Sequence, residues 1–180
     1  MFSLCWAATG WSQTPEMVAR EYIDSMRNAD MEKAAALMHP AALERFRDIL
    51  VQIADALTAR DPQADLRKNP GMDLLFGEGG PAELKTTSPA KVFLNFMSKL
   101  YARVPMMREM VAGSQVHFIG HVDESENVSH VVYRTTLSRQ GTEVTKVEVL
   151  SLKRHGENWR VLLTGDLERL ATSIGRGAPQ

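Results

Sequence analysis

The stretch that decides the fold is residues 114–164, SQVHFIGHVDESENVSHVVYRTTLSRQGTEVTKVEVLSLKRHGENWRVLLT. It divides into four runs rich in Val, Ile, Leu, Thr and aromatic residues, at 116–123, 128–138, 142–154 and 158–164. Polar residues and glycines separate these runs, as in the loops of β-hairpins. The stretch therefore predicts a four-stranded antiparallel meander that needs a cover of other elements on at least one apolar face.

Helical patterns precede this sheet and supply the cover. Thr14 before a proline is typical of a helix start, with apolar residues then spaced three and four apart. Asp30 is expected to cap a shorter second helix. Pro40 ends that helix, because the residue before a proline is pushed out of helical conformation, and it opens a third. Ser88 before Pro89 begins a fourth helix, which brings a second apolar stripe to the sheet.

Two further segments complete the chain. Residues 61–87 are interrupted by prolines and glycines but keep an apolar centre at 72–76, so we expect them to dock, as a helical turn over a pocket. Asp166 is expected to cap a final helix that covers 167–174 and stops at Gly175.

The composition is that of one soluble globular domain. The 180 residues are 44% hydrophobic and 24% charged, with a formal net charge of -1. This balance gives no electrostatic argument for nucleic acid or an anionic membrane as the main partner. There is no apolar run of the roughly 18 residues that a membrane span needs. Because Gly-rich phosphate loops, nucleophile elbows and His-Glu-x-x-His motifs do not occur either, we predict no cofactor and no metal.

The first thirteen residues differ from the rest. Residues 1–13, MFSLCWAATGWSQ, are apolar and rich in small residues. They look like the later part of a secretory signal peptide that lacks its basic region, or else like an apolar tail. The first interpretation predicts an exported protein, periplasmic or secreted, and the second a cytoplasmic one. In either case residues 14–175 are expected to form a single domain, followed by a disordered tail at 176–180.

Three short motifs carry a resemblance to a known superfamily. They are Pro15 with Ala19-Arg20-Glu21-Tyr22-Ile23, the run 30–38 (DMEKAAALM), and the run 157–161 (ENWRV). Together they resemble the nuclear-transport-factor-2-like (SnoaL-like, cystatin-like cone) superfamily. The resemblance implies an α+β fold, a cone in which N-terminal helices pack on a curved four-stranded antiparallel sheet. Members include isomerases, dehydratases, cyclases and non-enzymatic binding or partner domains, so the fold alone does not choose a function.

Loop lengths predict how the strands pair. They place Phe118 opposite Tyr133, Tyr133 opposite Glu148 and Leu152 opposite Val161. One face of the sheet is then apolar and suited to the helices, and it comprises Val116, Phe118, Val122, Val131, Leu150, Leu152, Val161 and Leu163, with Trp159 at its edge. Tyr133, Thr135, Lys146 and Glu148 lie on the same face, clustered at one end.

This polar cluster is the candidate site. We expect a ligand pocket lined by Tyr22, Phe93, Met97, Phe118, Tyr133 and Glu148. Within it, Glu148 and Tyr133 are the candidate catalytic pair, because a carboxylate on an apolar wall has a raised pKa and a Tyr hydroxyl can hold a ligand carbonyl. The isomerases of the superfamily use that kind of acid and Tyr. Two other interpretations remain, in which the residues only line a ligand site or Glu148 and Lys146 form a solvated rim.

The opposite face is apolar enough to need a cover, and superfamily members commonly dimerise through it. It carries Ile119, Val132, Val147, Val149 and Leu162 among His117, His121, His130 and Arg134. We therefore expect a homodimer. His121 is predicted to lie opposite His130, but no third ligand accompanies them, so we interpret them as a hydrogen-bonded or surface pair and not as a metal site.

Three function hypotheses follow. The first is a non-catalytic binding module whose cup holds a small apolar ligand or is filled by core side chains. The second is a ketosteroid-isomerase-like or SnoaL-like isomerase or dehydratase that uses Glu148 and Tyr133. The third is an interaction protein that uses the outer sheet face.

Overall fold

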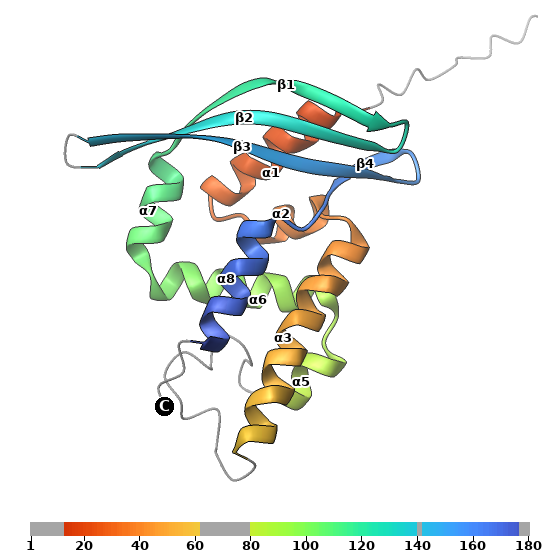
Figure 1. Ribbon diagram of the computed structural model, residues 1–180, viewed down its shortest axis with the longest axis vertical. Coiled ribbons are helices and arrows are strands. Elements are labelled where there is room, and N and C mark those ends of the chain that lie inside the picture. Colours follow the sequence, from red (N-terminus) through yellow and green to blue (C-terminus); the bar gives the residue numbers. More distant parts are fainter. Residues whose placement is uncertain (1–12, 62–79, 140–141, 177–180) are drawn as a thin grey trace, which may run out of the picture.

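A computed structural model describes residues 13–61, 80–139 and 142–176 of the chain. Helices come first, an antiparallel sheet follows, and one helix closes the chain (Figure 1). The helices before the sheet are α1 (Pro15–Arg27), α2 (Met31–Leu37), α3 (Pro40–Arg60), α5 (Pro81–Thr86), α6 (Pro89–Arg103) and α7 (Pro105–Gly113). The strands and the last helix are β1 (Gln115–Ser125), β2 (Val128–Arg139), β3 (Thr142–His155), β4 (Asn158–Val161) and α8 (Gly165–Arg176).

The four strands form one sheet in the order β1-β2-β3-β4, each antiparallel to the next. Three predicted pairings are present: Phe118 with Tyr133, Tyr133 with Glu148, and Leu152 with Val161. The helices lie on one side of the sheet in Figure 1. The predicted α+β class, helices packed on a four-stranded antiparallel sheet, is confirmed.

Side-chain caps fix where the first three helices begin. The Thr14 side chain accepts a hydrogen bond from the Met17 N–H and so starts α1, and the Asp30 carboxylate accepts one from the Lys33 N–H at the start of α2. His39 caps α3, because its Nδ1 accepts from the Ala41 N–H at 3.1 Å. The His39 N–H itself donates to the Val161 carbonyl at 2.8 Å, which ties the junction of α2 and α3 to the edge strand β4.

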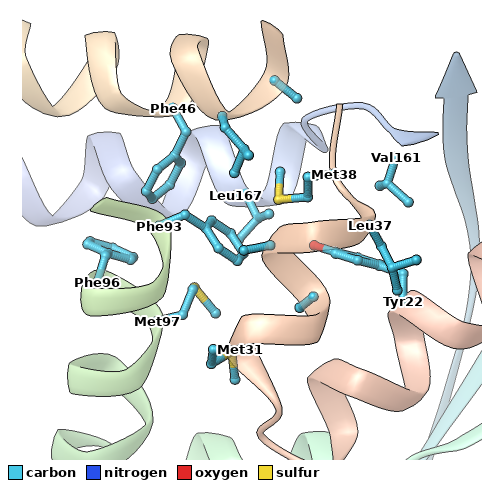
Figure 2. Packing of buried hydrophobic residues seen from close by; sticks show 14 of the residues in the cluster. Tyr22, Met31, Leu37, Met38, Phe46, Phe93, Phe96, Met97, Val161 and Leu167 are labelled. Carbon is cyan, nitrogen blue, oxygen red and sulfur yellow. The ribbon is translucent and has the colours of Figure 1, made fainter. Parts of the chain in front are cut away.

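The hydrophobic core lies between α3, α6 and the helix-facing side of the sheet (Figure 2). Its centre is aromatic: the Phe46 ring packs edge-on against Phe93 and Phe96, with ring centroids 5.5 and 5.2 Å apart. Leu152 and Val161 are fully buried and continue this core onto the sheet. The core thus fastens one end of the sheet tightly to the helices.

The predicted register is wrong beyond Phe118. β1 has an irregularity between Phe118 and Gly120, so His121 lies opposite Val131 and not opposite His130. The extra residue turns the rest of the strand over, because side chains alternate between faces. Val122 was expected on the helix-facing side, but it pairs with His130 and is 62% exposed.

The start of α8 also differs from expectation. The Thr164 hydroxyl, not Asp166, accepts the hydrogen bond from the first-turn Leu167 N–H, at 3.3 Å. Asp166 is thereby left to make ion pairs instead.

Several predictions fall on parts of the chain outside the described residues. These are the leader or tail at 1–13, of which only the last residue is described, residues 62–79 of the expected docking segment at 61–87, and 177–180 of the predicted tail. Arg176, the first residue of that expected tail, ends α8. Within the described ranges, none of the helices has the length and apolarity needed to cross a bilayer.

Candidate functional site

A cavity of about 400 Å³ lies between α1, α7, α8 and the helix-facing side of the sheet. It contains three of the six residues expected to line a pocket, Tyr22, Tyr133 and Glu148. Its full lining is Tyr22, Ile23, Met26, Arg27, Met107, Met110, Val111, Ser114, Val116, Tyr133, Thr135, Leu137, Glu148, Leu150, Thr164, Asp166 and Leu167.

The other three expected residues do not line this cavity. Phe93 and Met97 lie on α6 and are fully buried in the core below it (Figure 2). Phe118 packs against Tyr133, with ring centroids 6.0 Å apart, and the Arg20 guanidinium covers its ring at 4.1 Å. Amphipathic spacing identifies an apolar helix face, but it does not tell which of its residues meet a cavity and which meet other helices.

Most of the cavity wall is apolar and adaptable. Met26 on α1 and Met107 and Met110 on α7 line one side. Methionine is unbranched and polarisable, so it fits ligands of different shapes. An apolar wall with a few polar groups is typical of small-molecule sites.

The side formed by β3 and α8 carries paired charges. The Lys146 ammonium bridges two carboxylates: its Nζ lies 2.8 Å from Glu148 Oε1 and 3.2 Å from Asp166 Oδ2. Glu148 also accepts a hydrogen bond from the Thr135 hydroxyl at 3.0 Å, and Arg169 pairs with Asp166. We call Glu148, Asp166, Lys146 and Arg169 the carboxylate wall. Each of its carboxylates has a cation in contact.

Ionisation along this wall follows from these contacts. Burial, and then the neighbouring Glu148 carboxylate, raise the pKa of Tyr133 far above its usual value. Hydrogen bonds to Glu148 and Asp166 raise the pKa of Lys146, and Arg169, followed by Lys146, lowers the pKa of Asp166. At neutral pH Tyr133 therefore presents a protonated hydroxyl, able to donate or accept a hydrogen bond but not to act as a base.

The opposite side of the cavity, where α1 meets α7, carries a cation with loose partners. An Arg27 guanidinium nitrogen donates to the Ala112 carbonyl at 3.4 Å, and another lies 3.5 Å from Asp24. The Arg27 Nε is buried and has no hydrogen-bond partner. The two sides of the cavity thus differ in how completely their charges are matched.

Arg27 and Asp166 were not among the residues predicted for the site. A basic residue in the last turn of a helix is a common partner of the helix dipole, so the position of Arg27 did not mark it as a site residue. Asp166 was expected to be a helix cap. Their positions depend on how α7 and α8 close over the sheet, which a local pattern does not specify.

His121 and His130 each have their own contacts in the structure. Among the described residues, no group of three or more His, Cys, Asp and Glu side chains is placed to hold a metal ion. His121 lies near Glu16 of α1, at 3.3 Å, and near Asp123. His130 instead contacts Ser151 and Glu124, at 2.9 and 2.8 Å.

Comparison with known proteins yields one structural likeness. No family model matches the chain, and no curated protein does. Among solved structures, the chain is similar to an NTF-2 like protein of unknown function from Shewanella oneidensis MR-1, with 12% sequence identity and a TM-score of 0.41. The match covers 82% of this chain and 91% of that protein. A likeness at this level carries no argument about family or activity.

Proposed function

We propose that the protein is a non-catalytic binding module that holds a small, largely apolar molecule in the cavity. The observation that carries this proposal is the cavity of about 400 Å³ itself, apolar along α1 and α7 and polar where Tyr133 lies beside Glu148. The ligand's apolar body contacts the methionine side of the cavity.

The contacts of Glu148 favour binding over acid–base catalysis. The alternative function, an isomerase or dehydratase, needs this carboxylate to take a proton from a substrate. Glu148 is instead held by Lys146 at one carboxylate oxygen and by the Thr135 hydroxyl at the other, so both oxygens are occupied. A general base needs a free oxygen within reach of the substrate proton.

Native mass spectrometry of the purified protein tests the proposal. We expect a co-purified small molecule, or a one-to-one complex after incubation with neutral apolar probes such as 1-octanol. The Leu137→Phe variant, which places a larger side chain on a partly buried position of the cavity wall, is expected to weaken that complex. Protein that is empty and binds none of the probes contradicts the proposal.

The outer sheet face supports a second proposal, a homodimer interface. Ile119, Val122, Val147 and Val149 lie on strands that have helices on their other side, and each of these side chains is more than half exposed. Apolar patches of this kind mark interaction surfaces. A second copy of the chain offers the same apolar patch, so pairing of the two faces covers both. Sedimentation velocity at increasing protein concentration tests it, and a monomer at all concentrations contradicts it.

A further inference from the structure

We propose that the ligand is an apolar monocarboxylic acid whose carboxylate binds Arg27. This inference rests on the proposed function and deepens it by assigning the ligand's chemical class and the place of its charged group. The geometry behind it is the Arg27 guanidinium on the cavity lining where α1 meets α7, on a side chain that is 33% exposed and whose terminal nitrogens make long contacts at 3.4 and 3.5 Å.

Arg27 has hydrogen-bonding capacity that its protein contacts leave unused. A guanidinium has five N–H donors in a planar fork. The contacts to Ala112 and Asp24, at 3.4 and 3.5 Å, are both longer than a strong charge-assisted hydrogen bond. The Nε is enclosed by protein, so a ligand oxygen in the cavity meets the terminal nitrogens of the guanidinium. A carboxylate suits this place, because its two oxygens match the guanidinium fork.

The other charges of the cavity direct a ligand carboxylate to Arg27. Glu148 and Asp166 also line it, but Lys146 and Arg169 already neutralise them. A ligand cation at that wall would have to displace the Lys146 ammonium, and a ligand anion there would meet two carboxylates. Arg27 lies on α1 and contacts α7 through the Ala112 carbonyl, whereas Glu148 and Asp166 lie on β3 and α8. A ligand carboxylate on Arg27 therefore stays clear of the carboxylate wall.

The space between the two charged sides suits the apolar part of such an acid. Next to Arg27, the wall consists of apolar side chains from α1 and α7, namely Ile23, Met26, Met107, Met110 and Val111. The ligand's tail then points toward Tyr133. The inferred ligand class is an aliphatic or aromatic acid with one carboxylate and an apolar body.

Binding of a matched pair of probes tests this inference. Octanoate and 1-octanol share an aliphatic chain and differ in charge. Isothermal titration of the full chain with each probe, near neutral pH, gives a preference ratio for the acid. We expect wild-type protein to bind octanoate about tenfold more tightly than 1-octanol, and Arg27→Gln to lose that preference because its affinity for octanoate falls. Arg108→Gln, which removes an exposed cation from α7 outside the cavity lining, is the matched control and is expected to keep the preference.

The outcomes separate this inference from the proposed function. Equal binding of acid and alcohol by wild-type protein, or a preference that survives Arg27→Gln, overturns the inference and leaves ligand binding in the cavity standing. Failure of both probes to bind overturns both. Equal thermal unfolding midpoints of the variants and wild type ensure that a lost preference does not come from unfolding.

Discussion

The helix-facing side of the sheet has two ends that meet different neighbours. At the packed end, Val131, Leu152 and Val161 are fully buried, and β4 is tied to the junction of α2 and α3 through Val161. At the open end, Tyr133 and Glu148 face the cavity, which lies between the sheet and the helices α1, α7 and α8. Strands β2 and β3 supply side chains to both ends. The strand sequence decides which side chains face the helices, and the docking of the helices decides whether the space between sheet and helices is filled.

The difference predicts where the stability of the fold lies. Closely packed side chains lose both transfer free energy and contacts when they are shortened, whereas residues beside a cavity have fewer contacts to lose. The packed end is therefore expected to contribute stability, and the open end to contribute binding.

The largest expected effect comes from truncation at the packed end. Leu152→Ala should lower the free energy of unfolding by roughly 2–5 kcal/mol, because Leu152 is fully buried. Leu137→Ala, on the cavity wall and only partly buried, is the matched control and should cost about 1 kcal/mol or less. Urea denaturation measures both values. Equal losses at the two positions would remove the distinction between the ends.

A charge on the outer face should weaken the proposed dimer. Val147 is 55% exposed on the side of β3 away from the helices, so Val147→Glu leaves the core intact but places like charges together when two copies pair. We expect the dissociation constant to rise about tenfold or more, equivalent to about 1.4 kcal/mol. Sedimentation equilibrium measures the constant, and Lys91→Glu, which changes an exposed charge on α6 and not on the sheet, is the control. An unchanged constant would contradict dimerisation through this face.

The free energy of unfolding should fall in mild acid, because His39, which lies beside the packed end, then takes up a proton. Burial, then the charges of His155 and Lys153, lower the pKa of His39 below its ordinary value of 6.5. The unfolded state therefore binds a proton at His39 more readily than the folded state does. The contribution of His39 to the free energy of unfolding is present in full above pH 6.5 and is lost as the pH falls toward the folded-state pKa. Protonation of Nδ1 also removes the cap on the Ala41 N–H, a contribution on the order of 1 kcal/mol.

The His39→Asn variant isolates this effect, because Asn is a good cap that does not titrate. Denaturation at about pH 7 and about pH 5 should show a smaller loss for the variant than for wild-type protein. Identical losses would mean that other groups control the acid sensitivity.

The smallest expected effect is that of Glu148→Gln at the open end. Glutamine keeps an oxygen that can accept from Lys146 and Thr135, and an ion pair of partly exposed side chains contributes little. We expect a change of about 0.5 kcal/mol in the free energy of unfolding and the same affinity for 1-octanol. An isomerase or dehydratase activity that wild-type protein has and Glu148→Gln lacks would contradict a non-catalytic site.

Sequence reasoning predicted the sheet better than the cavity, for physical reasons. Alternation and loop length placed Tyr133 opposite Glu148, because these signals act between adjacent strands. The irregularity between Phe118 and Gly120 was missed because a regular register was assumed, although an isolated glycine inside a strand is a signal of a bulge. Phe93 was assigned to the cavity although it lies in the core. Helical spacing shows that a residue is on the apolar face of its helix, but it does not show which other element packs against that residue.

Methionine methyl groups allow the two ends to be compared in one NMR experiment. Met26, Met107 and Met110 line the cavity, whereas Met38 and Met97 are buried in the packed core. With methyl-labelled methionine and added 1-octanol, we predict concentration-dependent shifts for the three cavity methyls and none for the two core methyls. No shift at Met26, Met107 and Met110, or shifts of equal size at Met38 and Met97, would contradict a ligand site at the open end of the sheet.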